Sequence, residues 1–588
     1  MDRMSASKSS SSGADDPVLL AIVQKQLDHI TRQMGWIMTR TARSPLFSES
    51  HDFSCFLGTT KGEIASQADG LPIHSGAGGF ALRAVLDAFG DDIESGDVFI
   101  LNDPYVAGGN HLPDWTVVRP LFVDGKLAGF AANRAHQSDI GGGAAGTYNP
   151  EATEIFHEGL RLPVMRLVER NKLRRDVQQM LLLNSRCPDL MEGDLGAMLG
   201  SVRIGANQME DLLAGLASSR GTDYLDAVIE YGERRMTRAI AALPDGAWYG
   251  EDGSDTDCFG PIEVPIKVKL TVEKGALTFD FTGSSPQTKG FKNSSIANTH
   301  SAVYVAVASF FDASVPRNGG TFRPVKIIAP EGSVVNPIAP AAMTMNTVFP
   351  SVEIIHACWK ALAQTNPSRA CAGWGKGVSG ISSGRYENGR SFVLYHWHAS
   401  AGGGAVDGRD GFLQGGNLPT LAGRIMPNVE AYERIYPCRI HRHELRCDSG
   451  GAGQFRGGPS ADYDCEILVP SSLSVLAEGL HRPSGYGVHG ADWGAKGTMI
   501  VQEPDQESAS VPQYGIRHFS GPVRVVIQGT AGGGWGQPMR RSIDRVLRDV
   551  RDGLVSVDAA RAQYGVVLKP GHREVDLAAT NALREKAR

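Results

Sequence analysis

The sequence predicts a multidomain α+β protein of mixed α/β character, with Gly-rich antiparallel sheets and a central helical region. Three observations support this class. A chain of 588 residues exceeds what one hydrophobic core can hold, so several domains are expected. Stretches with the three- and four-residue spacing of helices alternate with stretches of strand-like period two. The 71 glycines indicate many turns or close backbone approaches.

The expected elements divide the first half of the chain into three segments. Residues 1–16 are Ser-rich and are expected to form a disordered tail. Residues 17–170 are expected to form an α+β domain that opens with an amphipathic helix and carries a candidate metal site. Residues 171–245 are expected to be helical and to end at a Pro-Asp-Gly stop. The opening helix is indicated by apolar residues at spacings of three and four: Leu20, Val23, Leu27, Ile30, Met34 and Met38.

Two further segments make up the second half. Residues 246–345 are expected to form a mixed β/α domain, in which a period-two pattern around Lys274-Gly275 predicts a β-hairpin. Residues 346–588 are expected to form a Gly-rich C-terminal α+β domain with terminal helices, two of them joined near Gly553. Two stretches there, DSGGAGQFRGG and GTAGGGWGQP, are interpreted as tight turns between strands, with backbone anion binding as the alternative.

Composition and charge narrow the functional class. The chain has 58 basic and 64 acidic residues, a net charge of −6 and no long run of Lys or Arg, so nucleic acid is not an expected partner. No apolar run reaches the length of a membrane span, so no membrane association is expected. The eight cysteines are scattered without a C-x-x-C pair, which is typical of free thiols in a reducing compartment. We therefore expect a cytoplasmic protein.

One apolar stretch carries a His-x-x-Asp arrangement at each end: GGNHLPDWTVVRPLFVDGKLAGFAANRAHQSDIGG. Two strand-like runs flank Asp124-Gly125, a strong tight-turn signal, and folding there brings the ends together. A three-residue loop would place Asp114 directly opposite His136 on one face, whereas a two-residue loop shifts the register by one. Either loop gathers four polar residues at one end of the hairpin: His111, Asp114, His136 and Asp139.

Such a cluster suits a divalent transition metal such as Zn, Mn or Fe, because imidazole nitrogen and carboxylate oxygen are the ligands these ions prefer. Ligands from two protein elements would leave coordination positions open for water or substrate, which favours a catalytic over a structural metal. The alternative interpretation is a surface hairpin whose His and Asp side chains cap turns and hydrogen-bond locally.

Other candidate motifs are weaker. The stretch HRHEL at residues 441–445 lacks the second His of a metalloprotease helix and is expected on a strand. The stretch GISSG around Ser382 fits G-x-S-x-G, but no apolar strand leads into it, so a flexible turn is expected. Neither a Walker A sequence nor a convincing dinucleotide fingerprint occurs. The chain itself therefore offers no recognisable nucleotide loop.

A series of stretches between about residues 16 and 567 carries a family resemblance: SESHDFSC, ILNDPYVAGGNHLPDWTVVRP, NRAHQSDIGG, EIFHEGLRLP, DFTGSSPQTKG, NGGTFRPVKIIAPEGSVVN, DSGGAGQFRGG and GGGWGQP. In this order they resemble the hydantoinase B/oxoprolinase family, whose B-type subunits are also similar to the acetone carboxylase α subunit and to acetophenone carboxylase and caprolactamase subunits. The resemblance implies a metal-containing subunit in a hetero-oligomer with a hydantoinase A-type subunit, which uses ATP and Mg.

The resemblance also implies site residues. The family's metal site carries over onto His111, Asp114 and His136, with Asp52 of HDFSC a further ligand or neighbour. Asp139 is then expected beside the ligands, where its carboxylate could orient a ligating imidazole. His74 in LPIHSGAG matches a family histidine. A catalytic role for it in the cavity, beside Asp114 and His136, and a purely structural role both stay open.

Two reaction types follow from the resemblance. We expect an ATP-dependent cyclic-amide hydrolase of the hydantoinase, oxoprolinase or lactamase type, in which ATP activates a small-molecule amide and the metal assists C–N cleavage. The alternative is an ATP-dependent ketone carboxylase, in which the metal stabilises an enolate that attacks CO₂; a catalytically silent scaffold is a third possibility. Because NDPYVAGGNH is one residue longer than the family's N-D-P-Y-x-G-G-T-H and has Asn in place of Thr, the substrate stays open.

Overall fold

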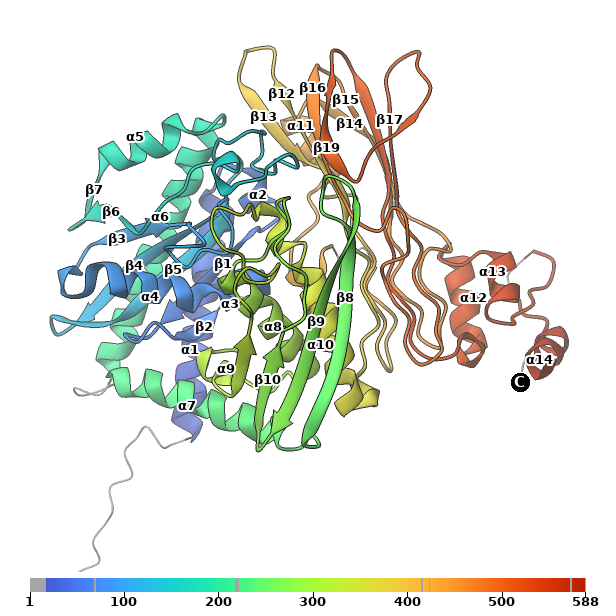
Figure 1. Cartoon of the computed structure of the whole chain (residues 1–588), viewed down its shortest axis with the longest axis horizontal. Coiled ribbons are helices and arrows are strands. Elements are labelled where there is room, and N and C mark those ends of the chain that lie inside the picture. The colour runs from blue at the N-terminus through green and yellow to red at the C-terminus, as the bar shows by residue number, and fades with distance from the viewer. Residues whose placement is uncertain are drawn as a thin grey trace, which may run out of the picture.

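The computed structural model describes residues 17–67, 70–216, 221–413, 416–421, 423–571 and 574–586 (Figure 1). The tail expected at residues 1–16 lies outside these described residues. Helices and antiparallel sheets follow one another along the chain, which confirms the mixed α+β class. None of the helices within the described ranges is long and apolar enough to cross a lipid bilayer.

The N-terminal part is built around a seven-stranded sheet with the order β2-β1-β5-β4-β3-β6-β7. Every neighbouring pair in it is antiparallel. The strands are β1 (Phe53–Gly58), β2 (Ile64–Gln67), β3 (Val98–Leu101), β4 (Asp114–Val123), β5 (Lys126–His136), β6 (Met165–Glu169) and β7 (Lys172–Leu173).

Apolar cores cover both faces of this sheet. Successive side chains of a strand point to opposite faces, so alternate residues of β1 belong to different cores. On one face, α1 (Pro17–Thr41) and α6 (Pro188–Gly215) join the core that contains Cys55 and Leu57. On the other, α4 (Gly78–Phe89) joins the core that contains Phe56. The six residues that predicted α1 are all buried, which confirms the amphipathic helix: Leu20, Val23, Leu27, Ile30, Met34 and Met38.

The helical region and a second sheet follow. The helices α5 (Arg175–Leu183), α6 and α7 (Gly221–Ile240) confirm the helical character expected after the first sheet. A four-stranded sheet then has the order β11-β10-β9-β8 and packs against α10 (Ser351–Thr365), which in turn packs against α8 (Ile296–Phe310). Its strands are β8 (Gly246–Thr256), β9 (Pro261–Glu273), β10 (Ala276–Asp280) and β11 (Val325–Ile328). The hairpin predicted at Lys274-Gly275 is confirmed, with φ of 48° and 81° at the turn.

Two sheets enclose a separate core in the last third of the chain (Figure 1, yellow to orange). One contains β12 (Val378–Arg385), β13 (Ser391–Tyr395), β16 (Ser471–Ala477) and β19 (Tyr514–Phe519). The other contains β14 (Cys438–Leu445), β15 (Ala461–Ile467), β17 (Thr498–Gln502), β18 (Ala509–Ser510) and β20 (Val523–Gln528). The expected terminal helices are α12 (Ile543–Arg551), α13 (Val557–Ala562) and α14 (Leu577–Lys586), which project from the rest of the molecule in Figure 1.

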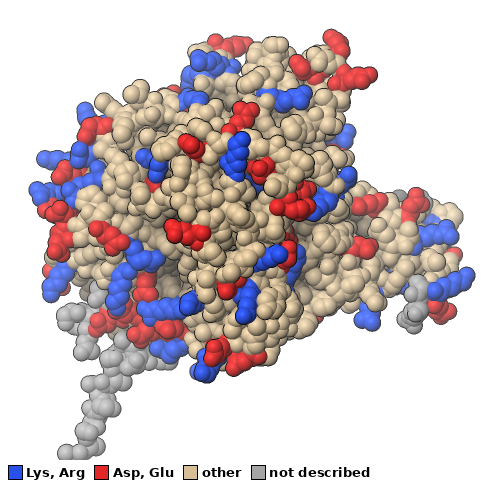
Figure 2. All heavy atoms as spheres, in the orientation of Figure 1, with Lys and Arg blue, Asp and Glu red and all other residues tan. Residues whose placement is uncertain are grey.

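Charged side chains of both signs are interspersed over the face of the molecule seen in Figure 2. The blue Lys and Arg groups and the red Asp and Glu groups alternate over the strands as well as over the projecting helices. Neither sign dominates this face.

A stack of extended glycine-rich segments lies beneath the last two sheets. The amide of Gly458 donates to the carbonyl of Gly403 (2.8 Å), and the amide of Gly532 donates to the carbonyl of Gly458 (3.0 Å). A Cβ added at Gly458 would lie 1.9 Å from the carbonyl oxygen of Phe412, and one at Gly532 would lie 2.0 Å from that of Gly403. The expectation of tight turns in DSGGAGQFRGG and GTAGGGWGQP is therefore wrong for these positions. Their glycines let backbones from distant parts of the chain pack directly on one another.

The stack predicts a severe cost for a single methyl group. Gly458→Ala is expected to lower the free energy of unfolding by at least about 3 kcal/mol, because the new Cβ overlaps backbone atoms that cannot move aside independently. Urea denaturation measures this change. Gly521→Ala is the matched control, since an added Cβ there meets nothing within 4 Å and φ is not in the left-handed region. A difference of less than 1 kcal/mol between the two variants would contradict the packing argument.

Candidate metal centre

The hairpin of β4 and β5 places Asp114 directly opposite His136. Its tip is the two-residue turn Asp124-Gly125, with φ of 51° and 73°, as the type I′ turn requires. A two-residue turn alone would shift the register by one. A β-bulge two residue pairs from the turn, between Phe122 and Leu121 of β4, adds the missing residue and restores the pairing that the three-residue loop would have given. The bulge therefore decides that Asp114 and His136 share a face.

Side chains from four segments converge at this end of the hairpin. Asp52 precedes β1, His74 lies on α3 (Pro72–Gly76), His111 precedes β4, and Asp114 and His136 face each other across the hairpin. The exposed fraction of each is 8% or less, and His111 and Asp114 are fully buried. Three of the five, His111, Asp114 and His136, present ligand atoms that all lie within 4.8 Å of one another.

The proton on His111 is fixed by a backbone carbonyl. Its Nδ1 lies 2.5 Å from the carbonyl oxygen of Thr344, which can only accept, so Nδ1 carries the hydrogen. The other nitrogen, Nε2, is therefore unprotonated in the neutral ring. It lies 2.9 Å from Oδ1 of Asp114 and forms no hydrogen bond with any described residue.

Tyr395 favours the His136 tautomer that carries its hydrogen on Nε2. The hydroxyl of Tyr395 donates to the carbonyl of Gly146 (2.9 Å), so its oxygen is left to accept from Nε2 of His136 (3.2 Å). The Nδ1 of the neutral ring then carries no hydrogen and lies 3.0 Å from Oδ1 of Asp114.

Two nitrogen lone pairs and one carboxylate oxygen thus point at a common position inside the protein. Three electron-rich atoms at this spacing repel one another unless a positive charge lies between them. A divalent transition metal is the natural charge for two imidazoles and a carboxylate, each of which is oriented from outside by a hydrogen bond. The residues present therefore fit such an ion.

The remaining two predicted residues border this position. Nε2 of His74 lies 3.1 Å from Oδ2 of Asp114 and 3.7 Å from Oδ1 of Asp52, and its Nδ1 has no partner among the described residues. Burial lowers the pKa of His74, against the opposing charges of Asp114 and Asp52, so this ring is neutral. His74 can thus offer a lone pair to a reacting group.

Electrostatics keep the central carboxylate charged. Burial alone would raise the pKa of Asp114, but His111 and His74 beside it hold that pKa well below its usual range. For His111, burial lowers the pKa, and the charge of Asp114 together with the Thr344 carbonyl outweighs it and raises the pKa. A proton therefore competes with a metal for His111, so acid favours loss of the ion.

Glu158, which holds the segment that contacts His111, was not identified from the sequence. Its fully buried carboxylate accepts hydrogen bonds from the amides of Met343 and Thr344, at 2.6 to 3.0 Å, and so holds the segment whose carbonyl orients His111. Burial raises the pKa of Glu158 to about 7, although the two amides lower it. The only signal in the sequence was its place in EIFHEGLRLP.

Asp139 does not contact an imidazole, contrary to expectation. Its carboxylate accepts from the amides of Gly141 and Gly146 and pairs with the guanidinium of Arg186 at 3.0 Å. The contact braces the loop that follows the hairpin. Since the carbonyl of Gly146 receives the Tyr395 hydroxyl, the effect of Asp139 on His136 is indirect.

The stretches HRHEL and GISSG both lie on strands. The stretch HRHEL lies on β14, as expected. The stretch GISSG is not a flexible turn but part of β12, where Ser382 is buried and its hydroxyl lies 2.8 Å from Nε2 of His396. The strand forms because β13 and β16 pair with it on both sides. It runs on past Ser382, so the strand-to-helix elbow of a serine hydrolase is not formed there.

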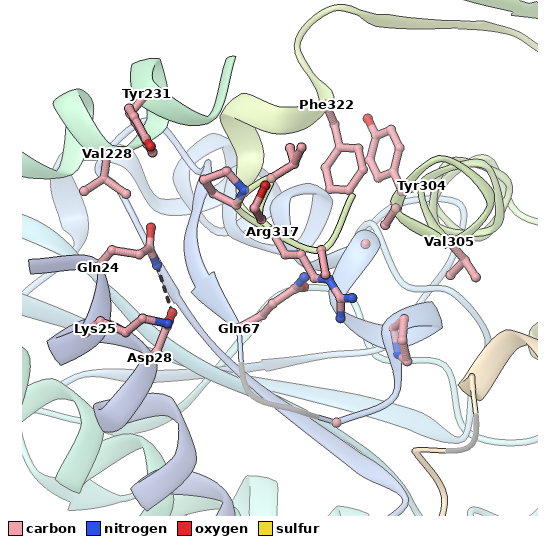
Figure 3. A pocket seen from close by; sticks show the side chains of 18 of the residues that line it. Gln24, Lys25, Asp28, Gln67, Val228, Tyr231, Tyr304, Val305, Arg317 and Phe322 are labelled. Atoms are coloured by element: carbon pink, nitrogen blue, oxygen red, sulfur yellow. Dashed lines mark hydrogen bonds and ion pairs between the residues drawn. The ribbon is translucent and has the colours of Figure 1, made fainter. Parts of the chain in front are cut away.

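Two cavities adjoin the segment of residues 70–76. One borders the metal position and is lined by residues that include Asp52, His74 and His136. The other, of about 470 Å³, lies on the opposite side of this segment, between α1, α7 and α8 (Figure 3). Arg317 and Tyr304 face Gln24 and Asp28 of α1 across it.

The hydrogen bond from His136 to Tyr395 yields a prediction. Tyr395→Phe removes the acceptor that fixes the ring, so metal affinity is expected to fall about 10- to 100-fold with the fold intact. Titration against a chromogenic chelator measures this affinity. Tyr386→Phe is the control, because the Tyr386 hydroxyl bonds to Ile435 away from the cluster. Equal affinity in both variants would show that Tyr395 does not orient a ligand.

The chain is similar in sequence to several known enzymes and enzyme subunits. Relatives include the caprolactamase subunit beta of Pseudomonas jessenii, which is 34% identical over 97% of this chain and 99% of its own length. Another is 5-oxoprolinase 1 of Arabidopsis thaliana, which is 27% identical over 89% of this chain, a region that makes up 42% of that protein.

Solved structures of related proteins have the same fold as this chain. The crystal structure of the ATP-dependent caprolactamase from Pseudomonas jessenii matches with a TM-score of 0.88 at 31% identity, over 97% of this chain and 99% of that one. A nucleotide-free acetone carboxylase structure matches with a TM-score of 0.88 at 19% identity, over 98% of this chain and 83% of that one, and shows a shared fold. The family model for hydantoinase B/oxoprolinase matches residues 16–538. The chain is therefore a member of the hydantoinase B/oxoprolinase family.

Proposed function

We propose that this chain is the metal-containing B-type subunit of an ATP-dependent cyclic-amide hydrolase. The observation that carries the proposal is the convergence of unprotonated nitrogens of His111 and His136 on the Asp114 carboxylate. The similarity to a caprolactamase subunit over nearly the full length of both chains supports the amide as substrate class. Cytoplasmic location belongs to the same proposal.

Each residue at the site has its own role in the proposed reaction. His111, Asp114 and His136 would hold the ion, with Asp52 as a further ligand at the cavity side. A divalent Zn, Mn or Fe ion would supply Lewis-acid polarisation of the amide carbonyl. Asp114 draws a hydrogen from Nε2 of His74, 3.1 Å away, which leaves Nδ1 of His74 as the base that takes a proton from the nucleophile. The buried walls exclude bulk water from this step.

ATP, which supplies the energy for the reaction, would be bound by another subunit. The sequence contains no Walker A motif, so ATP and Mg would be bound by a hydantoinase A-type partner in a hetero-oligomer. The match to a structure described as an ATP-dependent caprolactamase supports this division. The fold shared with acetone carboxylase makes a ketone carboxylase the competing function.

Metal content is the first expectation. The purified chain should hold about one transition-metal ion, and His111→Ala and His136→Ala should each lose most of it, because each removes one of three converging donors. Elemental analysis after dialysis measures the ratio.

The control for this experiment is His518→Ala, which changes an exposed histidine on β19 that bonds only to Ser472. Equal metal in the wild-type protein and all three variants would exclude the His-Asp-His centre.

Reaction class is the second expectation. With its partner and ATP, the chain should open the ring of a hydantoin, 5-oxoproline or a lactam, and the product should contain no carbon from labelled bicarbonate. Asp114→Asn should lower turnover at least about 100-fold, because a neutral amide is a poorer ligand and leaves the metal's charge unbalanced. Chromatography identifies the products, and phosphate release measures ATP hydrolysis. The isolated chain is the control and should release no phosphate.

Asp124→Asn is the matched control for Asp114→Asn. It makes the same chemical change on the same hairpin, at a turn position where Asn-Gly is favoured. Label incorporated into a keto acid from a ketone, with no ring opening of any amide, would replace the hydrolase by the carboxylase.

A further inference from the structure

The cavity beside the metal position contains a positive charge without an acidic partner. Arg424 lines this cavity together with Asp52, His74 and His136. The residue is only partly exposed, and its guanidinium lies 4.5 Å from the centre of the Trp397 ring. A cation–π contact of this kind uses the face of the Trp397 ring and leaves the N–H groups of the guanidinium available to donate.

No described residue satisfies those N–H groups. None accepts a hydrogen bond from Arg424, and none places a carboxylate oxygen within the 4.0 Å of an ion pair. Burial lowers the pKa of Arg424, and Asp52, which forms no ion pair with it, opposes this through its charge. Because Arg424 is only partly exposed, a ligand that enters the cavity would displace water from its N–H groups, and this costs free energy unless the ligand supplies an acceptor in place of the water.

A second unsatisfied donor lines the same cavity. The hydroxyl of Ser400 is on a residue with 3% exposure and has no hydrogen-bond partner among the described residues. Ser400 follows Trp397 by three positions on the segment after β13, so the ring that orients Arg424 and this hydroxyl belong to one stretch of chain. A charged donor and a neutral donor therefore line the same cavity as Asp52, His74 and His136.

We propose that Arg424, aided by Ser400, binds a carboxylate or phosphoryl group of the molecule that reacts at the His111, Asp114 and His136 centre. The inference rests on the proposed function for the reaction, but the anion site itself depends only on the two unpartnered donors. The planar fork of Arg424 matches two oxygens of either group, and Ser400 can supply a further hydrogen bond. The reacting molecule would then be held between a cation at one end and a metal at the other.

Two sources of the anionic group give different binding patterns. A carboxylate would belong to the cyclic amide itself, as in 5-oxoproline, whose uncharged counterpart without that group is 2-pyrrolidinone. A phosphoryl group would be added from ATP, and inorganic phosphate is its simplest probe. These three compounds therefore test the site on the isolated chain without the partner.

Arg424→Met is the informative variant, because it keeps the length and the contact with Trp397 but removes the charge and the donors. Isothermal titration calorimetry should show at least a tenfold loss in affinity for phosphate, for 5-oxoproline, or for both, and no change for 2-pyrrolidinone. A loss for phosphate alone assigns a phosphoryl group, and a loss for 5-oxoproline assigns a substrate carboxylate. Arg317→Met, which removes an exposed arginine that lines the other cavity, is the control and should bind like the wild-type protein.

Affinities for phosphate and 5-oxoproline that change less than twofold in Arg424→Met would overturn the proposal, as would wild-type protein that binds neither. Metal content and thermal unfolding are measured on the same samples, so loss of the ion or of the fold is separated from loss of the anion site. A chain that binds phosphate through Arg424 and holds no metal would contradict the metal centre and leave the anion site in place.

Discussion

A carboxylate that is withdrawn from water must be met by positive or hydrogen-bonding groups, and Asp114 is such a carboxylate at the centre of this molecule. Oδ1 lies 2.9 and 3.0 Å from nitrogens of His111 and His136, and Oδ2 accepts from the side-chain Nδ2 of Asn110 at 2.6 Å. Asn110 and His111 belong to the loop before β4, and His136 ends β5. The packing of the first domain is therefore organised around one charge.

The orientation of the two histidines depends on residues outside that domain. Thr344 belongs to the segment after the second sheet, and Tyr395 belongs to β13 of the third part of the chain. Each contact favours one tautomer of its histidine, so the arrangement that the proposed metal requires forms only when the three parts of the chain are assembled. Misfolding of any of the three parts would therefore disturb the cluster, although its atoms occupy a small volume.

Local patterns predicted much of this architecture. The spacing of Leu20 to Met38 predicted α1, and Asp124-Gly125 predicted the hairpin, because both signals depend on near neighbours in the sequence. The register could not be predicted, since the β-bulge depends on how both strands pack. Thr344 and Tyr395 could not be found either, because they lie 233 and 259 residues from the histidines that they orient. For Ser382, neighbouring glycine and serine suggested a turn, whereas strands on both sides imposed β structure.

The glycine stack has a consequence for how the chain is synthesised and assembled. Gly403 bonds to Gly458, and Gly458 to Gly532, so the contacts join points separated by many residues and have no local version. A nascent chain that ends before residue 529 has neither the donor that Gly458 requires nor the layer that covers Gly403. The C-terminal third therefore closes only after its last strands have left the ribosome, and its non-local pairing belongs to the slow class of folding events. Until then the backbone groups of the stack lack the partners that they have in the folded protein.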